Sequence, residues 1–157
     1  QTIHPGTAAY IRRGYALPVF EQAVQNLRRR RISVIVHTIL CLPGETRQQM
    51  FETLDYLNRR DIQGIKLQLL HILRDTDLAA EYESHPFPVP DMAEYITLLG
   101  ECISRLRPDL TIHRLTGDGP KELLIAPLWT GNKRTVLNRL HQYLKEQDIW
   151  QGKEYHE

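Results

Sequence analysis

One short segment, His113-Arg-Leu-Thr-Gly-Asp-Gly-Pro120, combines side chains that could transfer protons. His113 and Asp118 are a possible acid/base pair, with Arg114 beside them. The glycines on either side of Asp118 are typical turn residues. The segment is not a phosphate-binding loop, because no Gly-Lys-Ser/Thr sequence follows it.

Two other segments place side chains where parallel strands are expected to end. His71 ends an apolar stretch, at the edge where functional residues of parallel α/β proteins gather. A buried, hydrogen-bonded structural histidine is an equally good interpretation of His71. The segment Cys41-Leu-Pro-Gly-Glu-Thr46 is either a well-capped strand-to-helix turn or a loop whose backbone approaches a ligand.

The basic block Arg28-Arg-Arg-Arg31 lies at the end of a predicted helix, where cations complement the helix dipole. A nucleic-acid contact is the alternative interpretation. Cys41 and Cys102 are far apart and have neither CxxC nor His/Cys spacing, so we predict no metal site.

Composition excludes several classes of protein. The 157 residues include 20 Lys+Arg and 19 Asp+Glu, for a net charge of +1. This balance argues against a chain-wide surface for nucleic acid or anionic membrane. No apolar run approaches the ~20 residues of a spanning helix. Two cysteines are too few for a disulfide framework, so we expect a cytoplasmic protein without membrane association.

The elements that must position these residues alternate along the chain. Apolar periodicity predicts helices over 18–30, 46–60, 91–106 and 131–147, and strands near 32–40, 64–72 and 110–115. Such alternation is typical of an α/β fold with parallel strands and crossover helices. The proline-rich stretch 85–90 is expected to be a connecting loop.

Three parallel strands leave two open edges, which proteins normally cover. The chain also begins at Gln1 without a methionine. We therefore expect either strands upstream of this sequence or association of chains through the open edges.

Several segments, taken in order, resemble the C-terminal half of radical S-adenosylmethionine proteins. The most similar group is the YhcC/YtqA type, related to the branch of the elongator catalytic subunit, the tRNA methylthiotransferases and coproporphyrinogen dehydrogenase. The resemblance rests on the His113 to Pro120 segment and on Gln1-Thr2, Ile11-Arg-Arg-Gly14, His37-Thr-Ile-Leu-Cys-Leu-Pro-Gly-Glu-Thr46, Gly64-Ile-Lys-Leu-Gln-Leu-Leu-His71 and Leu123-Leu-Ile-Ala-Pro-Leu-Trp129.

This resemblance implies the C-terminal half of a partial (βα)6 TIM-like barrel over residues 1–84, followed by a C-terminal extension with a helical cap over 85–157. It implies S-adenosylmethionine and a [4Fe–4S] cluster as cofactors of the full-length, oxidoreductase-like enzyme. Members act on different substrates, so it assigns no substrate and no catalytic residue. The implied cofactor-binding residues are Gln1, Arg13, Ile39 and Leu70, and the substrate-side candidates are His71, His113, Arg114 and Asp118.

The sequence also departs from the family pattern. The Cys-x3-Cys-x2-Cys set that binds the cluster is absent from 1–157, so we expect this chain alone to be inactive and to retain no cofactor. Its expected partner is the N-terminal half of the same protein. His37 replaces an aspartate of some relatives, and Cys41 replaces a glycine. The alternatives are a cluster-free α/β binding module that contacts nucleic acid through Arg28–Arg31, or an inactive structural domain.

Overall fold

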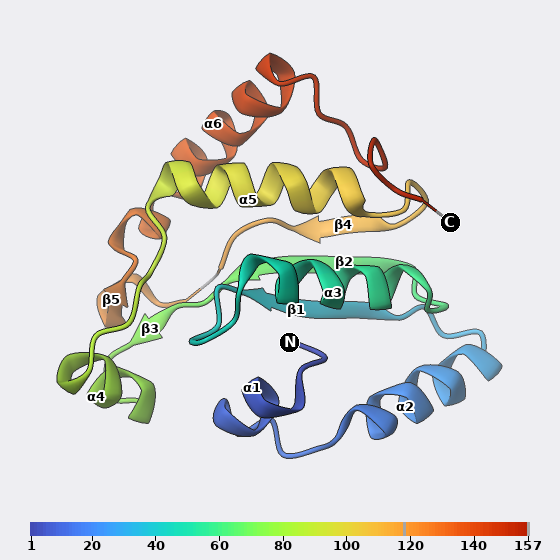
Figure 1. Cartoon of the computed structure of the whole chain (residues 1–157), viewed down its shortest axis with the longest axis horizontal. Coiled ribbons are helices and arrows are strands. Elements are labelled where there is room, and N and C mark those ends of the chain that lie inside the picture. The colour runs from blue at the N-terminus through green and yellow to red at the C-terminus, as the bar shows by residue number, and fades with distance from the viewer. Residues whose placement is uncertain (118, 157) are drawn as a thin grey trace.

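Three parallel strands form the main sheet (Figure 1). The computed structural model describes residues 1–117 and 119–156. β1 (Ile35–Leu40) pairs with β2 (Gly64–Leu69), and β2 pairs with β4 (Thr111–Arg114), in the order β1-β2-β4. The predicted α/β class and parallel sheet are confirmed. Within the described residues the sheet stays open, so no closed barrel is present.

Four long helices correspond to the four predicted ones. They are α2 (Leu17–Arg29), α3 (Arg47–Asn58), α5 (Met92–Arg105) and α6 (Lys133–Glu146). The first turns of α3 and α5 are closed by capping boxes, in which Thr46 pairs with Gln49 and Asp91 with Glu94. These reciprocal bonds satisfy backbone N–H groups that a helix start otherwise leaves unpaired.

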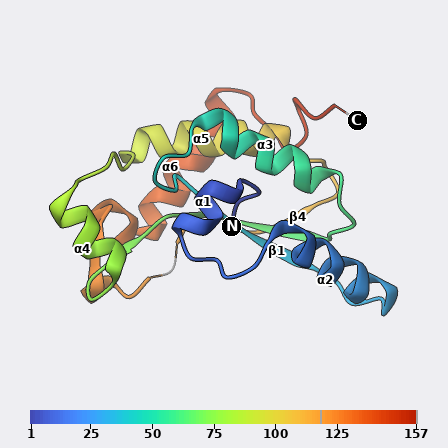
Figure 2. The same cartoon turned by 60° about the horizontal axis from the view of Figure 1, so that its bottom comes forward.

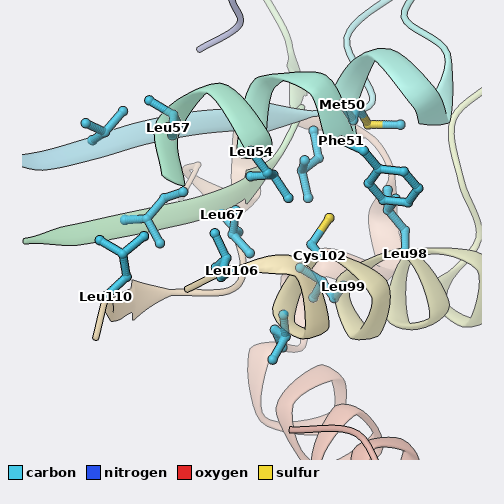
Figure 3. Close-up of a cluster of buried hydrophobic side chains, with 14 of the residues drawn as sticks. Met50, Phe51, Leu54, Leu57, Leu67, Leu98, Leu99, Cys102, Leu106 and Leu110 are labelled. Carbon is cyan, nitrogen blue, oxygen red and sulfur yellow. The ribbon is translucent and has the colours of Figure 1, made fainter. Parts of the chain in front are cut away.

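One face of the sheet is buried against helices. Side chains of β1 and β2 alternate, and Leu40, Ile65 and Leu67 pack against Leu54 of α3 and Leu99 of α5. Figure 3 shows the α3 and α5 side chains of this cluster pointing toward one another beside the strands. The same core extends from α2 to α6, so it joins residues of both 1–84 and 85–157.

Within residues 1–117 and 119–156, the opposite face of the sheet has no helix layer of this kind. Ile35 is 40% exposed and His37 is exposed, whereas their neighbours Val34 and Val36 are buried. We call this side the uncovered face. The strand register and burial pattern assign to it Ile35, His37, Ile39, Gly64, Lys66, Gln68, Thr111, His113 and Arg114.

Several elements were not predicted. The expected strand 64–72 stops at Leu69, and after His71 the chain forms a separate β3 (Ile72–Leu73), antiparallel to β5 (Leu124–Ala126). The other additions are α1 (Pro5–Tyr10), α4 (Asp77–Ser84), and the short 3-10 helices η1 (Lys121–Leu123) and η2 (Leu128–Gly131). Figure 2 shows α1 close to the N-terminus and α4 beside the orange β5 region.

The proline-rich connection 85–90 is irregular, as predicted, and is fixed by an aromatic side chain. Trp129 Nε1–H donates to the Pro90 carbonyl at 3.1 Å, and its ring lies 5.6 Å from that of Tyr95. Within the described residues no helix has the length and apolarity to cross a membrane.

Candidate functional site

A cavity of about 270 Å³ lies at the carboxyl ends of β1 and β2. Gln1, Ile39 and Leu70 all line it, so three of the four residues that the resemblance assigns to the cofactor surround one space. The remaining lining residues are Tyr10, Ile11, Arg12, Leu42, Asp77, Leu78 and Glu81.

Gln1 extends the sheet beyond β1. Its amino group donates to the His37 carbonyl at 2.6 Å, and the Ile39 N–H donates to the Gln1 carbonyl at 3.2 Å. In a parallel ladder, a residue makes these two bonds to the residues on either side of its partner. Gln1 therefore pairs with Thr38 as a residue of a parallel strand beside β1 would.

Arg13 lies away from this cavity. Its guanidinium donates to the Thr2 carbonyl at 2.6 Å and to the Tyr15 carbonyl at 3.0 Å, and it covers the Tyr15 ring at 4.9 Å. It lines a separate cavity of only about 30 Å³, together with Gln1 and Thr38. The preceding arginine, Arg12, lines the 270 Å³ cavity instead.

Helices α1 and α4 form the rim of the 270 Å³ cavity. Arg12 pairs with Asp77, and the Tyr10 hydroxyl donates to Glu81 at 2.5 Å. Burial and the Glu81 contact raise the pKa of Tyr10 to about 12. Sequence periodicity missed α4 because the helix is short, although Thr76, which caps it by accepting from the Ala79 N–H, was a usable signal.

His71 packs against the loop that follows β4. The Gly119 N–H donates to His71 Nδ1 at 3.3 Å, which leaves the ring proton on Nε2. Nε2 is buried and has no hydrogen-bond partner in the described part of the chain. Burial, with a smaller effect from Lys133, lowers the pKa of His71. His71 therefore contacts the predicted His113 to Pro120 segment, in which Asp118 lies outside the described residues.

His113 and Arg114 lie on the uncovered face and do not line the cavity. The His113 ring lies over Gly64, where a Cβ would be 2.6 Å from it. Arg114 aligns with Lys66 across a β-bulge. The substrate-side candidates are therefore divided between the His71 contact and this face.

Another cavity, of about 780 Å³, borders the Cys41 to Thr46 turn, for which the sequence left a ligand contact open. It is formed by the turn after β1, the stretch 87–90 and the start of α5, and includes Cys41, Met50, Phe87 and Leu98. Burial raises the pKa of Cys41 to about 12, and raises that of the fully buried Cys102 even further. Residues 1–117 and 119–156 contain no group of three or more His, Cys, Asp or Glu that could bind a metal ion.

The basic block is partly used inside the fold. Arg28 forms an ion pair with Asp61 at 2.9 Å and donates to the Ile32 carbonyl at 3.2 Å. Arg30 donates to the Asn26 carbonyl at 3.4 Å. The Arg28–Asp61 pair joins the end of α2 to the α3–β2 connection, and the two carbonyl contacts at the end of α2 agree with the helix-end interpretation.

Comparison with known proteins gives consistent matches over most of the chain. YtqA of Bacillus subtilis is 37% identical over 153 residues, and YhcC of Escherichia coli K12 is 31% identical over 149 residues. The matches cover 98% and 95% of this chain but 48% of each relative, so the chain spans about half the length of these relatives.

A solved structure has the same fold. Elp3 of the archaeon Methanocaldococcus infernus, with residues 1–46 deleted, superposes with a TM-score of 0.79 at 16% identity, over 96% of this chain and 35% of its own. The family model of the radical SAM C-terminal domain matches residues 62–146, which is more than half of the chain. The chain therefore belongs to the radical SAM C-terminal domain family.

Proposed function

We propose that this chain forms the adenosyl-binding side of a radical S-adenosylmethionine enzyme, as the C-terminal half of its partial barrel. The main support is the meeting of Gln1, Ile39 and Leu70 around one cavity at the carboxyl ends of parallel strands. In open α/β sheets this edge is the usual place for a ligand.

The cavity suits the adenosine part of the cofactor. Its volume of about 270 Å³ is slightly below the ~300–1,000 Å³ of most small-molecule sites. Ile39 and Leu70 supply apolar walls for a purine, and the Gln1 amide and Arg12 supply hydrogen-bonding groups. The Leu70 N–H already donates to the Leu40 carbonyl at 3.1 Å. The backbone group of Leu70 that remains for adenine is therefore its carbonyl, which accepts a hydrogen bond.

The residues of this chain do not fit the iron–sulfur cluster. A cluster that leaves one iron open for the cofactor needs three thiolates. The chain has two cysteines, and burial keeps both thiols protonated by raising their pKa values. We therefore assign the cluster to a separate N-terminal half, as the resemblance implies. The bound cofactor and cluster would supply a 5′-deoxyadenosyl radical, and the residues described here would orient the adenosyl group.

The edge of β1 is the proposed contact with that half. Gln1 already makes parallel-ladder bonds to β1, and the relatives are about twice as long as this chain. A strand continuing upstream from Gln1 would pair with Ile35 and cover an otherwise open edge.

The test begins with the coding frame upstream of Gln1, where we expect a Cys-x3-Cys-x2-Cys sequence. Protein made from that frame and reconstituted with iron and sulfide should bind S-adenosylmethionine in equilibrium dialysis. Ile39→Glu should abolish this binding by placing a carboxylate against adenine, whereas Val19→Glu, at an exposed position of α2, should leave it unchanged. A frame without those cysteines, or equal binding by both variants, contradicts the proposal.

Two arginine variants test which guanidinium matters. The resemblance assigns Arg13 to the cofactor, so Arg13→Ala is expected to weaken S-adenosylmethionine binding. The arginine that lines the cavity, however, is Arg12. Weakening by Arg12→Ala alone would move the assignment by one residue and leave the cavity as the binding site.

A further inference from the structure

The cavity of about 780 Å³ at the end of β1 has walls that are held in place by the fold. On one side, the turn after β1 is closed by the Glu45 N–H, which donates to the Leu42 carbonyl at 3.0 Å. On the other side, Pro88 and Pro90 restrict the backbone, and Trp129 Nε1–H donates to the Pro90 carbonyl. A ligand would therefore enter a largely pre-formed space, which lowers the entropic cost of binding.

Most of the wall of this cavity is apolar. Its volume falls within the ~300–1,000 Å³ of most small-molecule sites, which are likewise mostly apolar. Met50 of α3 and Leu98 of α5 lie at the same end of the buried cluster (Figure 3), and the wall also includes Cys41, Leu42, Phe87 and Val89. The Phe87 ring packs against that of Tyr82, with 5.1 Å between centroids, but stays partly exposed. The cavity therefore suits an apolar group of the size of a ring.

Two carboxylates border this space, those of Glu45 and Glu94. Glu45 accepts from the Thr2 hydroxyl and Glu94 accepts from the Asp91 N–H at 2.8 Å, so each uses one oxygen within the fold. The other oxygen of each accepts no hydrogen bond from residues 1–117 or 119–156, and neither carboxylate forms an ion pair with them. One oxygen of each carboxylate is therefore available to a ligand.

The positive groups at the cavity do not balance these two charges. Arg47 also lines it, but its guanidinium pairs with Glu101 through two contacts of 2.5 Å. The N-termini of α3 and α5 begin here, and each contributes only about half a positive charge. The remaining negative potential reaches the wall, because Glu94 and Glu45 raise the pKa of Cys41 after the larger effect of burial.

We propose that this cavity binds an amine, with its apolar ring against Phe87 and Leu98 and its ammonium group on Glu45 and Glu94. An ammonium group has three donors, and hydrogen bonds between opposite charges are stronger than neutral ones. Leu42 lines both this cavity and the 270 Å³ cavity, so the two are neighbours at the end of β1. Naming the amine a substrate rests on the proposed function, but the amine site is a property of this chain alone.

The test uses three probes that share an indole ring and differ in charge. Tryptamine carries an ammonium group, tryptophol a hydroxyl and indole-3-propionate a carboxylate. Each is titrated near neutral pH into the 157-residue chain, and the amide shifts are followed by NMR. We expect saturable shifts in 41–47, 87–89 and 93–98. Tryptamine should bind about tenfold or more tightly than tryptophol, because it adds a hydrogen bond between charged groups, and indole-3-propionate should bind most weakly.

Variants separate the charge from the apolar space. Glu45→Gln combined with Glu94→Gln should reduce the affinity for tryptamine to that for tryptophol and leave tryptophol binding unchanged, since glutamine still accepts the hydrogen bonds within the fold. Glu146→Gln, at the exposed end of α6, is the matched control and should change neither affinity. Ala93→Leu, at an exposed position of α5 on the cavity wall, should weaken all three probes by filling the space.

Equal affinity for tryptamine and indole-3-propionate, or a preference for tryptamine that survives the double glutamine variant, overturns the proposal. Shifts that do not saturate, or that Ala93→Leu leaves unchanged, overturn it as well, because the probes then bind elsewhere. Protein made from the longer frame should also bind tryptamine, and loss of binding there would mean that the N-terminal half fills the cavity. Failure of S-adenosylmethionine binding with intact tryptamine binding contradicts only the adenosyl assignment, and the reverse result contradicts only this one.

Discussion

Cys41 has a backbone conformation that favours glycine, with φ of +60°. This conformation agrees with the glycine that the family resemblance implies at this point of the turn. Any side chain with a Cβ is strained in this region, by ~1–2 kcal/mol. We therefore predict that Cys41→Gly is more stable than Cys41→Ala by ~1 kcal/mol in urea unfolding. At Cys102, in the middle of α5, the order should be reversed, because glycine is the poorer helix former.

Gly117 is required by its contact with His71. A Cβ at Gly117 would lie 2.3 Å from the His71 ring, closer than any real contact. Gly117→Ala should lower the free energy of unfolding by ~1–3 kcal/mol, as overpacking does. Gly131→Ala is the control, since a Cβ at Gly131 would meet no atom within 4 Å. Adding His71→Ala should recover most of the loss, and no recovery would mean that the strain has another source.

His71 also makes stability depend on pH. Its pKa in the folded protein is lowered from 6.5, mainly by burial, so below about pH 6.5 the unfolded chain binds a proton that the folded chain does not. The free energy of unfolding should therefore fall as the pH decreases from about 7.5 to about 5.5. The pKa of His37 is lowered as well and adds to this slope. His71→Gln should reduce the slope, whereas His141→Gln, on the exposed side of α6, should not.

Helix boundaries were the part of the fold that could be predicted from sequence, because their signals are local. The Thr46/Gln49 and Asp91/Glu94 patterns mark the starts of α3 and α5 to within one residue. We predict that Thr46→Ala lowers the free energy of unfolding by ~1 kcal/mol, while Thr46→Ser, which keeps the hydroxyl, has little effect. Equal losses in both variants would show that the methyl group, rather than the cap, is responsible.

Elements that depend on distant partners were missed. β3 has two residues and exists because Ile72 pairs with Ala126, more than fifty positions away. The break between β2 and β3 has the same origin, and no turn residue between Leu69 and Ile72 gave a sign of it. The candidate site has the same character: Ile39 and Leu70 were implied only by the family resemblance, and no local signal in the sequence indicates that they share a cavity with Gln1.

At the scale of the whole molecule, β1 is the edge strand beside Gln1, and its amides offer a direct test of the proposed partner. Along β1, the Ile39 N–H points away from β2 toward Gln1, so the N–H groups of Ile35 and His37 point to the same side. Those of Val36 and Thr38 point toward β2. In the 157-residue chain, we expect Ile35 and His37 to exchange their amide hydrogens with solvent much faster than Val36 and Thr38.

An N-terminal half that adds a parallel strand would accept hydrogen bonds from these two amides. In protein made from the longer frame, the exchange of Ile35 and His37 should therefore slow to the rates of Val36 and Thr38, because opening would then require separation of paired strands. Amides on β4, such as Ile112, should change little, since that strand lies at the far side of β2. Unchanged exchange of Ile35 and His37 would mean that the N-terminal half contacts this chain elsewhere, and that the edge of β1 stays open in the complete protein.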